Sequence, residues 1–210
     1  MKKSWLGIVL LIVASVSAAE VAPDAFSVKP LLAGERAPEF EAPSAAGEVF
    51  HFDPEALDRP TLIIFYRGGW CPYCNLHWAE LRRIEDELLA SGVDLIFLSA
   101  DRPSVLAEAM EDDDAPRYHL LSDASMEIAE AFGIAFKVDE ATVDRYLTYD
   151  IDLEAASGYD HHVLPAPATF LVDTDGVIKF QYVNPDYKVR LSPEVLLAVA
   201  RTMPDRILQR

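Results

Sequence analysis

The sequence predicts an α/β fold with a central mixed sheet flanked by helices. Continuous apolar, β-branched runs at 61–66 and 93–99 are typical of strands buried on both faces. Between such runs, apolar residues recur at helical spacing, and this alternation of strands and helices favours parallel pairing. The chain has 210 residues, of which 51% are hydrophobic, so one domain with a sizeable core is expected.

The first 19 residues have the pattern of a secretory signal peptide. Lys2 and Lys3 precede a short apolar run at 6–13, and small residues at 16–18 suit a cleavage site. A membrane anchor is the alternative, but the run is shorter than the ~20 residues that span a bilayer. We expect cleavage after Ala18 or Ala19 and a periplasmic or secreted protein that does not stay inserted in the membrane.

The charge of the chain excludes several partners. It carries 35 acidic and 18 basic side chains, a net charge of −17, so nucleic acid and anionic membranes are poor partners. The acidic run at 111–114 could bind a cation. However, consecutive carboxylates without the spaced ligands of a calcium loop are typical of solvated surface.

The remaining segments follow in a clear order. We expect an irregular arm at 20–33 and then one domain over 34–210, without internal repeats. Its predicted elements are an N-terminal hairpin (40–42 and 49–52), a strand (61–66), a helix (73–90), a strand (93–99), a helix (104–110), a strand (120–122), a helix (126–132), an insertion (135–164) with some helix at 141–147, a last hairpin (169–173 and 177–182) and a final helix (193–208). The ends of the insertion are expected to return to the main sheet.

The two cysteines, Cys71 and Cys74, are the centre of the predicted chemistry. They straddle the start of the helix at 73–90, and a helix N-terminus stabilises a thiolate. Pro72 suits the first turn, where no N–H is needed. Two intervening residues allow one sulfur to attack a substrate and the other to resolve the product. A zinc half-site or an inert disulfide is the alternative, although zinc normally requires a second ligand pair.

The residues around this pair resemble a known family. The segment at 65–74, Phe-Tyr-Arg-Gly-Gly-Trp-Cys-Pro-Tyr-Cys, is similar to the peroxiredoxin-like branch of the alkyl hydroperoxide reductase/thiol-specific antioxidant (AhpC/TSA) family, within the thioredoxin-like superfamily. The resemblance extends to 34–40, to 165–173 and to Gly176, and so covers nearly the whole mature chain. It implies a thioredoxin-like fold.

The resemblance also implies roles, with departures from the pattern. Cys74 falls at the peroxidatic cysteine, Cys71 at the family's Thr or Ser, and Arg67 at its proline. Pro167 falls where peroxiredoxins carry an arginine and thioredoxins a cis-proline. The buried aspartate of thioredoxins is replaced by Phe65. The site therefore resembles a hybrid of the two.

Four more side chains are candidates for contacting a substrate, and a fifth could supply a positive charge beside the thiolate. Arg67 could supply the missing cation beside the thiolate, or could simply face solvent. Trp70, Pro72, Tyr73 and Pro167 are expected to shape the approach to the sulfurs. For Trp70 a role confined to the core is the alternative.

Three histidines are weaker candidates. His77, one helical turn after Cys74, could shuttle a proton, or it could be an ordinary surface or core histidine. His161 and His162 could form a copper or zinc site with the cysteines, although loop histidines without a metal are more common. No cofactor is expected.

Three functions remain open. The first is a thiol-dependent peroxidase that reduces hydrogen peroxide or organic hydroperoxides through a dithiol/disulfide cycle. The second is an exported thiol-disulfide oxidoreductase in which Cys71 attacks a protein disulfide. The third is a copper-handling protein. Either enzyme, if exported, requires an exported or membrane dithiol reductant. The Pro-Tyr dipeptide, which resembles that of glutaredoxins, implies a disulfide easier to reduce than thioredoxin's.

Overall fold

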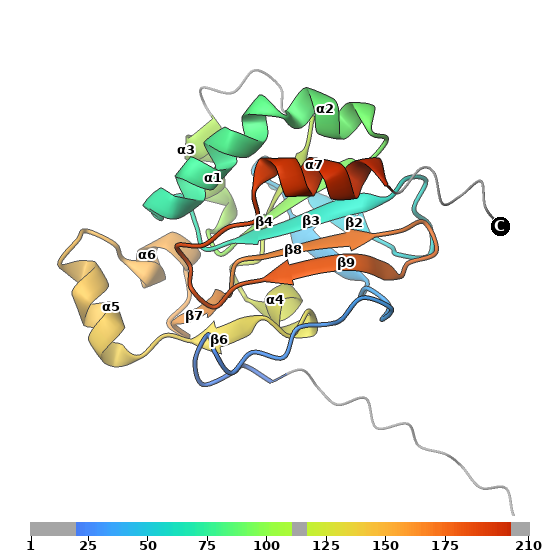
Figure 1. Cartoon of the computed structure of the whole chain (residues 1–210). Coiled ribbons are helices and arrows are strands. Elements are labelled where there is room, and N and C mark those ends of the chain that lie inside the picture. Colours follow the sequence, from blue (N-terminus) through green and yellow to red (C-terminus); the bar gives the residue numbers. More distant parts are fainter. Residues whose placement is uncertain (1–19, 111–116, 203–210) are drawn as a thin grey trace, which may run out of the picture.

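The computed structural model describes residues 20–110 and 117–202 (Figure 1). The predicted signal peptide, the acidic run at 111–114 and the end of the last predicted helix lie outside the described residues.

A five-stranded mixed sheet forms the centre of the fold. Its strand order is β5-β4-β3-β8-β9, and β3 lies in the middle. Strand β3 runs parallel to β4 and antiparallel to β8, because the last hairpin returns along the opposite direction. The strands are β3 (Thr61–Tyr66), β4 (Asp94–Ser99), β5 (His119–Ser122), β8 (Ala168–Val172) and β9 (Ile178–Val183). The expected mixed sheet is confirmed.

Helices cover both faces of this sheet (Figure 1). One face carries α1 (Pro72–Arg83), α2 (Glu85–Ala90), α3 (Pro103–Met110) and α7 (Pro193–Arg201); the other carries α4 (Glu127–Ala131). The predicted N-terminal hairpin forms from β1 (Phe40–Pro43) and β2 (Val49–Phe52) and packs beside α4. No helix in the described ranges is both long and apolar enough to cross a bilayer.

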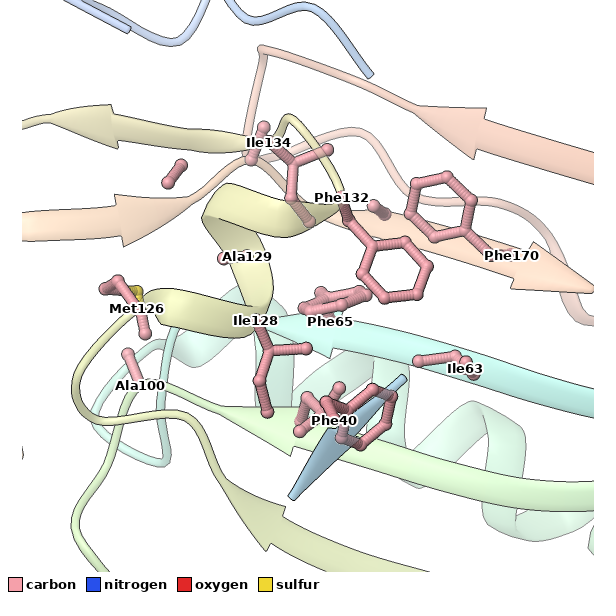
Figure 2. Close-up of a cluster of buried hydrophobic side chains, with 14 of the residues drawn as sticks. Phe40, Ile63, Phe65, Ala100, Met126, Ile128, Ala129, Phe132, Ile134 and Phe170 are labelled. Carbon is pink, nitrogen blue, oxygen red and sulfur yellow. The ribbon is translucent and has the colours of Figure 1, made fainter. Parts of the chain in front are cut away.

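Strand β3 separates two hydrophobic clusters. Its alternate residues Ile63 and Phe65 point into the cluster on the α4 face, where Phe65, Phe132 and Phe170 pack ring against ring (Figure 2). The residues between them, Leu62, Ile64 and Tyr66, belong to the cluster under α1 and α7. Every residue of β3 is buried, so the strand holds the site at its carboxyl end on a rigid base.

The helix predicted at 73–90 is two helices, which corrects that prediction. The break lies at Ile84, whose φ of −110° and ψ of 7° leave the helical range. Arg82 and Arg83 end α1, and Glu85 begins the acidic first turn of α2. Basic residues favour a helix C-terminus and acidic ones an N-terminus, so the charge order of these residues matches two helices.

The insertion at 135–164 forms its own small unit. Its ends, β6 (Ala135–Lys137) and β7 (Val163–Pro165), pair with each other, so the expectation that they return to the main sheet is wrong. Between them lie α5 (Glu140–Leu147) and α6 (Leu153–Ser157), which project from the body near the start of α1 (Figure 1). The arm at 20–33 has neither helix nor strand and binds β6 through backbone bonds of Ala22.

Candidate active site

The cysteine pair lies at the beginning of α1, directly after the loop that follows β3. Cys71 is the N-cap residue, and its carbonyl accepts the N–H groups of Cys74 (3.0 Å) and Asn75 (3.1 Å). Pro72 occupies the first turn, as expected. Both cysteines are free thiols, and only 1% of Cys71 and 4% of Cys74 is exposed. The structure therefore brings the two sulfurs together in a nearly closed site.

A buried carboxylate holds the loop that delivers the cysteines. Oδ2 of Asp101, just past the end of β4, accepts the Gly69 N–H at 2.7 Å and the Ser99 hydroxyl at 3.0 Å. Burial raises the pKa of Asp101. Gly68 adopts a φ of +138°, and a Cβ there would lie 2.6 Å from Asp101 Oδ1. The chain can pass between Asp101 and Trp70 only because residue 68 has no side chain.

The two thiols share a proton. A hydrogen bond from the Cys74 thiol, a backbone N–H and the charges of Arg67 and Arg190 together lower the pKa of Cys71 to about 6, although burial opposes them. The same bond, burial and the charge on Cys71 raise the pKa of Cys74. The pair therefore carries one negative charge at neutral pH.

Arg190, which the sequence did not single out, contacts the pair directly. Its Nη2 lies 3.2 Å from the Cys74 sulfur, and its Nη1 donates to the backbone carbonyls of Tyr187 and Val189. The residue lies in the segment between β9 and α7, 116 positions from Cys74. Arg190 thus brings a guanidinium to this sulfur from a part of the chain distant from the cysteine motif.

Arg67 lies in a cage of aromatic rings instead of facing solvent. Its side chain is 3% exposed, and its guanidinium lies 5.1, 5.5 and 4.4 Å from the ring centres of Trp70, Tyr146 and Tyr187. Its Nη2 also donates to the Tyr146 hydroxyl. The residue has no carboxylate partner among the described residues, so the cysteine thiolate is the anion that its charge stabilises.

The four residues expected to contact a substrate differ in how exposed they are. Trp70 is half-buried between Arg67 and the insertion, and Tyr73 is 39% exposed with its ring against Tyr187. Pro72 is exposed between the cysteines. Pro167 is buried with a trans peptide bond, and its carbonyl accepts the Asn184 N–H. Of these four residues, Pro72 and Tyr73 are the exposed ones, and contact with a substrate remains a prediction.

His77 is a buried histidine next to the pair. It is 7% exposed, and burial together with the charge of Arg190 lowers its pKa to about 4. Its Nε2 is buried without a hydrogen-bond partner in the described residues. The imidazole is therefore neutral at physiological pH, and a role in proton transfer remains a prediction.

The histidines of the insertion have hydrogen-bond partners inside and outside the insertion. His161 uses Nε2 on the Ala124 carbonyl at 2.8 Å, and its Nδ1 accepts the Val163 N–H. Nε2 of His162 lies 2.9 Å from a carboxylate oxygen of Glu154. Within the described ranges, no three His, Cys, Asp or Glu side chains gather as metal ligands do. The copper-handling alternative thus lacks a visible ligand set there.

Known proteins resemble this chain over most of its length. The AhpC/TSA family model matches residues 33–181. Peroxiredoxin Bcp of Escherichia coli K12 is 31% identical over 170 residues, which cover 81% of this chain and 96% of that protein. The thiol:disulfide interchange protein DsbE of Allochromatium vinosum is 27% identical over 172 residues, or 81% of this chain and 77% of that protein.

Solved structures share the fold. A peroxiredoxin-like protein from Aquifex aeolicus superposes with a TM-score of 0.64 at 18% identity, and covers 83% of this chain and 89% of its own. A cysteine-to-serine mutant of peroxiredoxin 6 from Arenicola marina gives a TM-score of 0.66 at 20% identity, with 83% and 74% covered. These likenesses confirm the expected thioredoxin-like fold.

Proposed function

Since the chain belongs to the AhpC/TSA family and is an oxidoreductase, we propose that it is a thiol peroxidase in which Cys74 attacks hydrogen peroxide or an organic hydroperoxide. The observation that carries this proposal is the guanidinium of Arg190, 3.2 Å from the Cys74 sulfur. A cation at this distance stabilises the thiolate and can bind the peroxide oxygen that becomes negative as the O–O bond breaks.

The resting charge on Cys71 does not prevent attack by Cys74. The two sulfurs are joined by a hydrogen bond, so the proton can pass from Cys74 to Cys71 before the slower chemical step. The Cys74 thiolate then attacks the terminal peroxide oxygen, forming Cys74 sulfenic acid and releasing the alcohol or water after protonation. Cys71 attacks the sulfenate sulfur, and a disulfide and water result. Two thiols are oxidised for each peroxide reduced.

Burial favours a small oxidant over a folded protein. With 1% and 4% of the cysteines exposed, a small peroxide has easier access to the sulfurs than a protein disulfide, whose approach requires the surrounding loops to move. This is why the peroxidase is ranked above the thiol-disulfide oxidoreductase. The latter remains the second candidate, because DsbE is among the relatives and Cys71 has the lowered pKa that exchange requires.

Single-cysteine variants test the proposal. In Cys71→Ser the hydroxyl can still donate to the Cys74 sulfur, and hydrogen peroxide should form a sulfenate at Cys74 much faster than on free cysteine. Cys74→Ser should react slowly. A fast sulfenate on Cys71 instead would reverse the order of the two cysteines. No acceleration in either variant, together with rapid reduction of protein disulfides by Cys71, would replace the proposal with the second candidate.

We also propose that the enzyme works outside the cytosol. The basic start, the short apolar run and the small residues at 16–18 support export with cleavage after Ala18 or Ala19. The reductant must then be an exported or membrane dithiol protein. Expression in a bacterial host, followed by fractionation and mass measurement of the mature N-terminus, tests this. A full-length chain in the cytosolic fraction would contradict it.

A further inference from the structure

A groove of about 490 Å³ lies beside the cysteine pair, between α1 and the segment that leads into α7. Hydrogen peroxide does not require a space of this size. The groove is connected to the site through Arg190, which lines it and also contacts the Cys74 sulfur. Its lining residues are Tyr73, Leu76, His77, Glu80, Arg83, Ile84, Lys188, Arg190, Leu191, Ser192, Pro193 and Glu194.

The groove carries positive charge on an acidic protein. Arg83 and Lys188, both exposed, form no ion pair with any described residue, and neither does Arg190. Two carboxylates, Glu80 and Glu194, also line the groove, so cations exceed acids there, whereas the whole chain carries −17. A negatively charged partner is therefore repelled by the protein as a whole and attracted at this groove.

The groove also has exposed apolar side chains in its lining and next to it along the chain. Leu76, on its wall, is 60% exposed, and Tyr73 lies at its end next to the cysteines. Val189 and Val195 are exposed immediately beside lining residues. Apolar contacts rimmed by charges are typical of surfaces that bind another protein transiently.

We propose that this groove docks the reductant, a dithiol protein with an acidic surface around its cysteines, and that the reductant attacks the disulfide at Cys74. This inference rests on the proposed dithiol/disulfide cycle. Because Cys74 is only 4% exposed, docking must also move the loops around it. The reductant thiolate then bonds to the Cys74 sulfur, the Cys71–Cys74 bond breaks, and Cys71 leaves as a thiolate. The second thiolate of the reductant then attacks the reductant sulfur that is bonded to Cys74. A disulfide forms in the reductant, and Cys74 leaves as a thiolate and takes a proton.

Two observations support attack at Cys74. Arg190 lines the groove and contacts the Cys74 sulfur, whereas Cys71 is 1% exposed and directly follows the loop that Asp101 holds. In a disulfide Cys74 cannot donate a hydrogen bond to Cys71, but the charges of Arg67 and Arg190, which also lower the pKa of Cys71, remain and favour Cys71 as the leaving group.

Charge reversal tests the docking surface. The disulfide is prepared with diamide, so that the test does not depend on the peroxide reaction. Its reduction is followed with a thioredoxin of net negative charge and, separately, with dithiothreitol. The ratio of the thioredoxin rate to the dithiothreitol rate is then compared between the wild type and each variant. In Arg83→Glu/Lys188→Glu this ratio should fall roughly tenfold at low salt and approach that of the wild type near ~1 M salt, where screening removes the effect.

The matched control reverses two exposed cations outside the groove, Lys29→Glu/Arg102→Glu. An equal fall in the control, or an unchanged ratio in the groove variant, would overturn the docking surface.

The attack site is tested by mixing the oxidised protein with a thioredoxin that lacks its second cysteine. Mass spectrometry of the trapped mixed disulfide should find the bond at Cys74, and a bond at Cys71 would overturn that step.

Discussion

Two guanidinium groups approach the cysteine pair from distant parts of the chain. Arg67 comes from the loop before α1, and Arg190 from the segment before α7. Arg67 is buried among rings, so its charge acts on Cys71 through a weakly screening environment. Arg190 is only half-buried but touches the Cys74 sulfur. Both charges add to the hydrogen bond from the Cys74 thiol in lowering the pKa of Cys71, and Arg190 is also placed to assist the reaction.

Replacing Arg190 should affect both acidity and rate. In Arg190→Gln the pKa of the Cys71 thiol should rise, because one stabilising charge is lost, and the rate with peroxide should fall about tenfold to a hundredfold. Arg190→Lys should recover part of the acidity but not the contact geometry. Thiolate absorbance against pH and stopped-flow rates measure these effects. Arg102→Gln, an exposed arginine outside the site, is the control, and equal rates in both variants would contradict the role.

His77 should make the protein sensitive to acid. Its pKa is lowered to about 4 in the folded protein, so below pH ~6.5 the unfolded chain binds a proton that the folded protein does not. The neutral His77 therefore does not lower the free energy of unfolding above this pH, but that free energy falls as the pH drops toward 4. The shift corresponds to about 3 kcal/mol. His77→Gln should show a smaller difference in the free energy of unfolding between pH 7 and 4.5, and an identical difference would contradict the burial argument.

At the level of elements, the loop between β3 and α1 is the most constrained segment of the site. Gly68 places backbone where a side chain would collide with Trp70 Nε1 at 2.4 Å and with Asp101. The loop N–H of Gly69 is bound by the same carboxylate. A rigid strand, a fastened loop and a helix start thus position the cysteines in succession.

Gly68→Ala should disturb this loop more than a comparable change elsewhere. The φ of +138° and the collisions should together cost about 3 kcal/mol and reduce peroxide turnover. Gly92→Ala, at a positive φ with nothing within 4 Å, should cost only about 1 kcal/mol and leave turnover intact. Denaturant unfolding and turnover measure both. Similar losses in the two variants would contradict the argument.

Local patterns predicted most elements of this fold and the centre of its site. The apolar runs at 61–66 and 93–99 became the buried strands β3 and β4, and the cysteines lie at the expected helix start. The break at Ile84 was missed because apolar spacing continues through it, although the charges around it indicated two helices. The self-pairing of β6 and β7 depends on contacts between distant segments, which periodicity does not contain.

At the level of the whole molecule, the site is completed by residues that only the tertiary fold unites. Tyr146 comes from the insertion, while Tyr187 and Arg190 come from the segment before α7. None of them belongs to the motif around the cysteines, and an arginine or tyrosine far from that motif carries no distinguishing pattern in a single sequence. Asp101 had a weak signal, since a lone acidic residue directly follows a buried strand.

The reduced protein should be more stable than the oxidised one. Oxidation removes the negative charge of the pair but leaves Arg67 buried without a counter-charge among the described residues. Thermal unfolding should therefore occur at a lower temperature for the disulfide form. In Arg67→Met, which keeps a long apolar side chain within the rings, the difference between the two forms should shrink. A disulfide form that unfolds at a higher temperature than the dithiol would contradict this.

The aromatic cage around Arg67 also bears on electron flow. Whatever makes the dithiol more favourable than the disulfide raises the midpoint potential of the couple, by about 30 mV for every ~1.4 kcal/mol. The pair should therefore accept electrons readily from a donor of lower potential and return them poorly. Such a couple turns over in one direction, from donor to oxidant, and the rings that confine one guanidinium contribute to that direction.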